Sequence, residues 1–332
     1  MKLKITVTDK DTHFYGRGKL LITSEYFVLN GAEALAIPTK FGQHLKVRQL
    51  QSNSNMLFWV ALGSDGNVWL SMCIDRETLL PIGDAPSEAT ILCGMLSAIR
   101  KMEPDFLTQT NDTAIETRLD FPQVWGLGSS STLIHCLAEW SGVNAYKLLQ
   151  ETIGGSGYDL ACAAADSAIL YTLNDGQPNT MQVNWKPLFS ENIFFAYTGK
   201  KQISRTAIEK YRQIVSEPER TINQLNNITH AMLKCESLET FEQLVNEHEN
   251  IIGAQLKMVK VKETMFSDYW GSVKSLGAWG GDFVMLTNNR TREELYDYLK
   301  VKNITTVFSW NELLISAKET PAHSDNSLKL PL

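Results

Sequence analysis

The chain has 332 residues, of which 43% are hydrophobic and 20% charged, a composition typical of ordinary soluble globular proteins. Its net charge of −6 argues against a nucleic-acid binder, which normally carries a basic patch or stripe. Because no stretch approaches about 20 apolar residues, no membrane span is expected, and the charged, alternating N-terminus is typical of a strand rather than a signal peptide.

Strand-like runs dominate the first 75 residues. Alternation of polar and apolar residues predicts strands over 3–8, 19–22, 44–50, 57–62 and 68–74. The last two flank Gly63–Ser64–Asp65–Gly66–Asn67, which is typical of a hairpin loop. A helix is predicted after Pro86 and Ser87, since apolar residues then recur at helical spacing: Ile91, Leu92, Met95, Leu96 and Ile99.

The remainder alternates between short strands and longer helices. A strand over 114–121 leads through a glycine-rich loop into a helix over 132–140, and the small-residue run 160–170 predicts a tightly packed helix or a closely approached backbone. A strand over 193–197 is expected to start a second domain with helices over 204–215, 219–234 and 238–260 and a strand over 283–289. Thr291 opens a further helix, with Glu294 placed for a capping box.

Strand clusters mixed with segregated helices favour an α+β fold over a doubly wound parallel sheet. We expect an N-terminal domain over 1–188, a C-terminal α+β domain over 189–320 and a frayed tail over 321–332.

The glycine-rich loop is the most informative feature of the chain. Residues 126–130 read Gly-Leu-Gly-Ser-Ser between a strand and a helix, so backbone N–H groups and the positive helix end can together bind a phosphate. The same string also serves as an ordinary turn followed by a helix cap. It is neither a Walker loop nor a dinucleotide fingerprint, because Ser131 stands where the latter needs its last glycine.

Three other stretches strengthen the phosphate interpretation. They read GKLLITSEYFVLNGAEALAI at 18–37, GGSGYDLA at 154–161 and GAWGGDFV at 277–284. With GLGSSSTL at 126–133, in this order, they resemble the motifs of the GHMP small-molecule kinases, most closely the mevalonate and phosphomevalonate kinase branch. The resemblance implies an N-terminal domain like domain 2 of ribosomal protein S5, a ferredoxin-like C-terminal domain and an active site between them.

The resemblance also implies roles for single residues. Asp159 matches the carboxylate that accepts the proton of the acceptor hydroxyl or polarises that hydroxyl, and Lys19 matches the cation that steadies the developing charge. Ser130 is expected to contact Mg²⁺, with Glu151 as the nearest acid for a second ligand. The ATP phosphates are assigned to Gly126, Leu127, Gly128, Ser129, Ser130 and Ser131.

Further residues are expected at the substrate and phosphate loops. Glu25 follows the first motif and can orient Lys19 or contact substrate, and Lys200, next to Lys201, suits an anionic acceptor. Each has a plainer interpretation as a solvated surface side chain or a turn residue. The other members of this set are Ser156, Gly157, Ser204, Gly277, Gly280 and Gly281.

Two departures from the family pattern bear on the acceptor. Ser24 stands where a glycine is usual before Glu25, and the indoles of Trp125 and Trp279 stand beside glycine loops, where they can narrow the pocket or stack on adenine.

We therefore predict an ATP- and Mg²⁺-dependent kinase that phosphorylates a small molecule, with mevalonate or phosphomevalonate favoured. The alternatives are a decarboxylase of the diphosphomevalonate type, another GHMP sugar or amino-alcohol kinase, and a non-catalytic nucleotide or metabolite sensor. The cysteines at 73, 93, 136, 162 and 235 lack paired spacing, which favours free thiols in a reducing cytoplasm over structural zinc. No nucleic-acid or membrane partner is expected, and monomer and homodimer stay open.

Overall fold

The computed structural model describes residues 11–200, 204–214, 218–277, 279 and 282–315. Within them the larger of two sheets has seven strands, in the order β4-β3-β5-β2-β6-β7 with β1 paired to β2. All its pairs are antiparallel except β3 with β5. Its strands are β1 (Thr12–Leu21), β2 (Ala34–Gln49), β3 (Met56–Leu62), β4 (Val68–Asp75), β5 (Thr113–Leu119), β6 (Ala168–Asn174) and β7 (Gln177–Val183).

The second sheet is antiparallel, with the order β11-β8-β10-β9. It consists of β8 (Ile193–Tyr197), β9 (Val273–Ser275), β10 (Phe283–Thr287) and β11 (Val307–Ser309). The predicted domain boundary near residue 188 falls between the end of β7 and the start of β8 and stays a prediction. Both sheets contribute to one hydrophobic cluster, in which Leu20 and Leu35 are buried together with Phe195 and Phe283.

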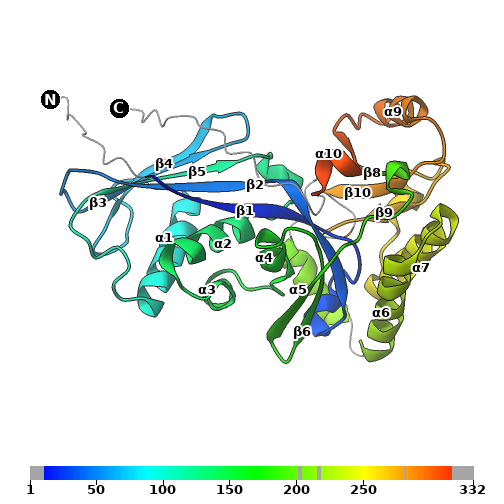
Figure 1. Ribbon diagram of the computed structural model, residues 1–332, viewed down its shortest axis with the longest axis horizontal. Helices are drawn as coiled ribbons and strands as arrows, with labels where there is room; N and C mark the ends of the chain where they lie inside the picture. Colours follow the sequence, from blue (N-terminus) through cyan, green and yellow to red (C-terminus); the bar gives the residue numbers. More distant parts are fainter. Residues whose placement is uncertain (1–10, 201–203, 215–217, 278, 280–281, 316–332) are drawn as a thin grey trace.

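The helices fall into two groups along the chain. Four lie on one face of the larger sheet (Figure 1): α1 (Ser87–Met102), α2 (Ser129–Ser141), α3 (Ala145–Thr152) and α4 (Tyr158–Ala163). The other six follow β8: α5 (Ser204–Ile214), α6 (Glu219–Lys234), α7 (Leu238–Leu256), α8 (Val261–Met265), α9 (Arg292–Val301) and α10 (Trp310–Leu313). This arrangement confirms the predicted α+β fold class.

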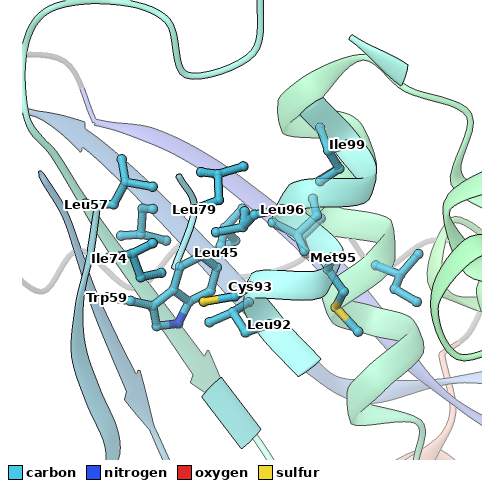
Figure 2. Packing of buried hydrophobic residues seen from close by; sticks show 14 of the residues in the cluster. Leu45, Leu57, Trp59, Ile74, Leu79, Leu92, Cys93, Met95, Leu96 and Ile99 are labelled. Atoms are coloured by element: carbon cyan, nitrogen blue, oxygen red, sulfur yellow. The ribbon is translucent and has the colours of Figure 1, made fainter. Parts of the chain in front are cut away.

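The core against the larger sheet is formed by apolar residues of the strands and by the apolar face of α1 that the sequence predicts. Figure 2 shows Trp59 and Ile74 of the sheet beside Leu92 and Leu96 of α1. All four side chains are at most 4% exposed. Each contributes about 1.5–3 kcal/mol on burial, which fixes α1 against the sheet and so supports α2 and the loop before it.

Several local predictions are confirmed. Gly63 donates its N–H to the carbonyl of Asn67 and closes the β3–β4 hairpin, and Thr291 and Glu294 form the capping box that starts α9. The five cysteines are free, as expected. Among the described residues no helix is both long and apolar enough to cross a membrane.

Other local predictions need correction. The small-residue run is not one helix: α4 ends at Ala163 and β6 begins at Ala168, because Ala165 and the following turn reverse the chain into the sheet. The helix predicted over 238–260 ends at Leu256, since Lys257 adopts a left-handed backbone with φ of 52°. The predicted strand over 3–8 and the tail over 321–332 lie outside the described residues.

Candidate functional site

The glycine loop between β5 and α2 leaves the N-terminus of α2 open. Gly126 and Gly128 have positive φ angles of 69° and 93°, a conformation that side-chain-bearing residues rarely adopt. Gly128 occupies the N-cap position of α2, and because it has no side chain it makes no side-chain capping hydrogen bond to the first turn. The predicted serines therefore do not cap α2, and the N–H groups of Ser129, Ser130 and Ser131 begin a helix whose positive end can bind an anion.

The loop residues differ in how accessible they are. Leu127 is fully buried and anchors the loop in the core shared by the two sheets. Ser130 is exposed, Ser129 is half-buried and Ser131 is buried. The hydroxyl that the resemblance assigns to the metal is therefore the most accessible of the three.

Lys19 is held against this loop from β1. Its backbone N–H donates to the carbonyl of Leu127 at 3.0 Å, and its Nζ donates to the carbonyl of Gly126 at 3.0 Å. The side chain is buried, and its ammonium group lies 5.6 Å from the centre of the Tyr158 ring. A cation is thus fixed at the start of the glycine loop.

Asp159 lies next to the same loop, on α4. It lies in the first turn of α4, after Gly157, whose φ is 86°. A Cβ atom on Gly128 would lie 3.4 Å from the Lys19 side chain and 4.0 Å from the Cβ of Asp159, so these two residues flank Gly128. No ion pair joins them within the described part of the chain, and Asp159 is half-buried rather than enclosed.

The charge of Asp159 affects the pKa of two neighbouring groups, Cys162 and Tyr158, and the charge of Lys19 affects that of Cys162. Burial raises the pKa of the Cys162 thiol above its usual range, with Asp159 adding to the rise and Lys19 opposing it. Burial and then the Asp159 carboxylate raise the pKa of Tyr158 well above 10. The cation and the carboxylate therefore share one small region beside the loop.

Asp282 is a site residue that the sequence analysis did not single out. A Cβ atom on Gly126 would come 2.2 Å from its Oδ2, so the carboxylate lies directly against the loop backbone. Asp282 is buried, and its own φ is 29°. The sequence does carry a signal for it, because Asp282 directly follows the glycines of the third motif. Glycine-rich loops commonly bind anions, so an acidic residue at the end of one is unusual.

Glu25 lies in a buried charged cluster rather than beside Lys19. Its Oε1 is 2.5 Å from the Nζ of Lys274, which also lies 3.4 Å from Oε1 of Glu249, and all three side chains are at most 2% exposed. Burial raises the pKa of Glu25 to about 7, against the attraction of Lys274 and with the help of Glu249. Two carboxylates thus share one buried ammonium group, and Glu25 keeps its proton to a higher pH than a carboxyl group in water does.

The two indoles beside the glycine loops, Trp279 and Trp125, differ in burial. Trp279 is 2% exposed and packs against α7, so it does not stack on adenine. Trp125 is half-buried, 5.8 Å from the ring of Phe283 and 5.9 Å from that of Phe41.

The remaining predicted residues are less closely joined to the loop. Glu151 is exposed near the end of α3, and Lys200 is exposed, with its carbonyl accepting from Asp282 N at 2.7 Å. Ser156 is buried and its carbonyl accepts a hydrogen bond from Tyr171, while Gly277 has a φ of 70°. Outside the described part lie the side chain of Ser204 and all of Lys201, Gly280 and Gly281.

The sequence itself matches no protein-family model and no curated protein. The fold, in contrast, matches solved structures over nearly the whole chain. The galactokinase of Lactococcus lactis complexed with galactose superposes with a TM-score of 0.68 at 14% identity, over 95% of this chain and 96% of that one. The phosphomevalonate kinase of Streptococcus pneumoniae in complex with phosphomevalonate and AMPPNP gives 0.65 at 15% identity, over 90% and 99%.

The mevalonate kinase of Methanococcus jannaschii gives a TM-score of 0.66 at 13% identity, over 92% of this chain and 99% of that chain. The chain is therefore similar in fold to three kinases with different acceptors.

Proposed function

From the fold that this chain shares with GHMP kinases, we propose that it is a small-molecule kinase that transfers the γ-phosphoryl group of ATP. The observation that carries the proposal is the meeting of Lys19, Asp159 and the open N-terminus of α2 around Gly128. Phosphoryl transfer needs the phosphates held, their charge neutralised and the attacking hydroxyl kept in line. The three features supply these needs from separate elements.

In the proposed reaction the acceptor oxygen bonds to the γ-phosphorus while the bond from that phosphorus to the β–γ bridging oxygen breaks. Asp159 accepts the hydroxyl proton or orients the hydroxyl, and Lys19 offsets the negative charge that develops beside the loop. Either role holds the acceptor oxygen in line with the γ-phosphorus, and phosphoryl transfer depends mainly on such positioning.

The residues around the loop also suit Mg²⁺. Hard cations of this size prefer oxygen ligands and usually keep several waters while binding one or two carboxylates and substrate phosphates. Ser130 offers an exposed hydroxyl, and Asp159 and Asp282 offer carboxylates next to Gly128 and Gly126. When bound, the ion would supply charge neutralisation at the phosphates. Glu151 is the weaker candidate, because no contact places it beside the loop.

Mevalonate or phosphomevalonate is the acceptor we favour, because the EYFVL, GSGYD and YTGK segments resemble that branch. The exposed Lys200 suits an acceptor with a carboxylate or phosphate. Galactose and homoserine are the comparison substrates, since one fold serves acceptors of different chemistry.

The test is ADP formation from Mg²⁺–ATP by the purified full chain, with mevalonate, phosphomevalonate, diphosphomevalonate, galactose or homoserine, and with CO₂ followed in parallel. Acceptor-dependent ADP without CO₂ supports the kinase. Release of CO₂ with diphosphomevalonate would make the protein a decarboxylase. Tight ATP binding without turnover on the panel would favour a sensor, and absence of ATP binding would overturn the loop assignment.

A further inference from the structure

The turn at Ser24–Glu25–Tyr26 has an unusual backbone. Ser24 and Tyr26 are both non-glycine residues with positive φ, 65° and 64°. The N–H of Ser24 donates to Nε2 of His248 at 3.0 Å, and its hydroxyl donates to the carbonyl of Glu33 at 2.7 Å. Such conformations persist only where surrounding contacts enforce them, and they gather at sites where position matters. The contacts of Glu25 and Tyr26 show which part of the protein this turn holds in place.

The side chains of Glu25 and Tyr26 both contact the region of the third glycine-rich motif, GAWGGDFV, about 250 residues further along the chain. Glu25 pairs with Lys274, which precedes that segment. The hydroxyl oxygen of Tyr26 accepts a hydrogen bond from the backbone N–H of Trp279 at 3.0 Å. The turn therefore holds Trp279 through the main chain and holds β9, the strand just before the segment, through an ion pair.

Trp279 is fixed from a second side by α7. Its Nε1 donates to Oε1 of Glu249 at 3.1 Å, and a Cβ atom on Gly253 would come 3.1 Å from its ring. The indole is buried among residues from the first motif, α5, α6 and α7: Tyr26, Phe27, Tyr211, Leu225, Ile252 and Leu256. Little freedom is left for Trp279 while these contacts hold.

The segment matters for the site because Asp282 follows Trp279 by three residues and lies against Gly126. We propose that Tyr26 is a positioning residue: by holding Trp279 it fixes Asp282 against the phosphate loop, and so sets the shape of the nucleotide site. This inference rests on the proposed function for its effect on ATP. Its structural part, the coupling of Tyr26 to Trp279 and Asp282, does not depend on that function.

The experiment compares Tyr26→Phe with Tyr269→Phe. Both tyrosines are buried and each hydroxyl makes one hydrogen bond to the main chain; that of Tyr269 donates to the carbonyl of Thr287 at 2.8 Å, away from the loop. The two variants should therefore lose similar stability. For each, binding of Mg²⁺–AMPPNP is measured by calorimetry, and amide hydrogen exchange is measured in the peptide spanning residues 274–286.

We expect Tyr26→Phe to weaken nucleotide binding about five- to twentyfold and to raise exchange in that peptide, while Tyr269→Phe changes nucleotide binding less than twofold. Equal effects of the two variants on binding and on exchange near Trp279 would overturn the inference. Trp279→Phe removes the bond to Glu249 and part of the buried ring, and it keeps the backbone N–H that donates to Tyr26. It serves as the second variant if Tyr26→Phe does not fold, and the same changes in binding and exchange are expected.

The two proposals fail separately. If the unmodified protein binds no nucleotide, the proposed function fails, and the exchange comparison alone then decides the coupling. Exchange that becomes faster in Tyr26→Phe but not in Tyr269→Phe supports the coupling. Unchanged exchange in Tyr26→Phe contradicts it.

Discussion

Among single substitutions in the buried charged cluster, Lys274→Met should lower the free energy of unfolding the most. The substitution removes the ammonium group that Glu25 and Glu249 share, and it keeps most of the length of the side chain. At an effective dielectric constant of about 20, the attraction is roughly 7 kcal/mol at 2.5 Å and roughly 5 kcal/mol at 3.4 Å. Desolvation of three buried charges offsets most of this gain.

The net cost of removing one partner of such a buried pair is about 3–5 kcal/mol, a large share of the stability of an ordinary domain. Without Lys274 the two carboxyl groups must be protonated to stay buried, so the cost should be smaller at pH 5.5 than at pH 8. Denaturant unfolding at both pH values measures it. The double variant Glu25→Gln/Lys274→Met, which removes one of the two acids, should recover a good part of the loss.

A cost below about 1 kcal/mol at pH 8, or a cost larger at pH 5.5 than at pH 8, would refute this reasoning. The first result would mean that the cluster is hydrated. The second would mean that the carboxyl groups do not carry the penalty.

Three further predictions concern single positions. Gly126→Ala should weaken nucleotide binding at least tenfold in calorimetry, since its Cβ would come 2.2 Å from Asp282 Oδ2; an added Asp282→Gly should restore part of the affinity, and no recovery would argue against this contact. Ser24→Gly should be about 1 kcal/mol more stable than Ser24→Ala in urea unfolding, because both lose the hydroxyl but only alanine keeps the left-handed strain. The pKa of Glu25 is raised to about 7 from 4.5, so the unfolded state loses its proton first as pH rises, and this group should remove on the order of 3 kcal/mol of stability between pH 4.5 and 7. Glu25→Gln should lack that loss, and a stability difference between the two proteins that does not vary with pH would contradict the assignment.

Much of the fold was predictable because its signals are local. The β3–β4 hairpin, the apolar face of α1 and the capping box of α9 each depend on residues a few positions apart. By contrast, β7 is polar and exposed along most of its length and β9 has three residues, so neither carries a usable pattern. Their strand character comes from pairing with β6 and β10.

The residues of the candidate site likewise fall into those that local motifs predict and those that depend on contacts distant in the sequence. The glycine loop, Lys19 and Asp159 were identified from motifs, and the structure brings them together. Glu25 was expected near Lys19, but its partner Lys274 is 249 positions away, and no local pattern reports a pair at that separation. Asp282 was missed because its importance depends on a contact with Gly126 across the two sheets.

Phosphoryl transfer from ATP to mevalonate and to phosphomevalonate can be followed by ³¹P NMR, with the unmodified chain and with Asp159→Asn. We expect a new phosphate-ester or diphosphate signal with one acceptor. Asp159→Asn should form it at least about a hundredfold more slowly, although the variant binds Mg²⁺–AMPPNP within a few-fold of the original. Equal transfer rates for the two proteins, or release of free phosphate with no acceptor product, would contradict the proposed function.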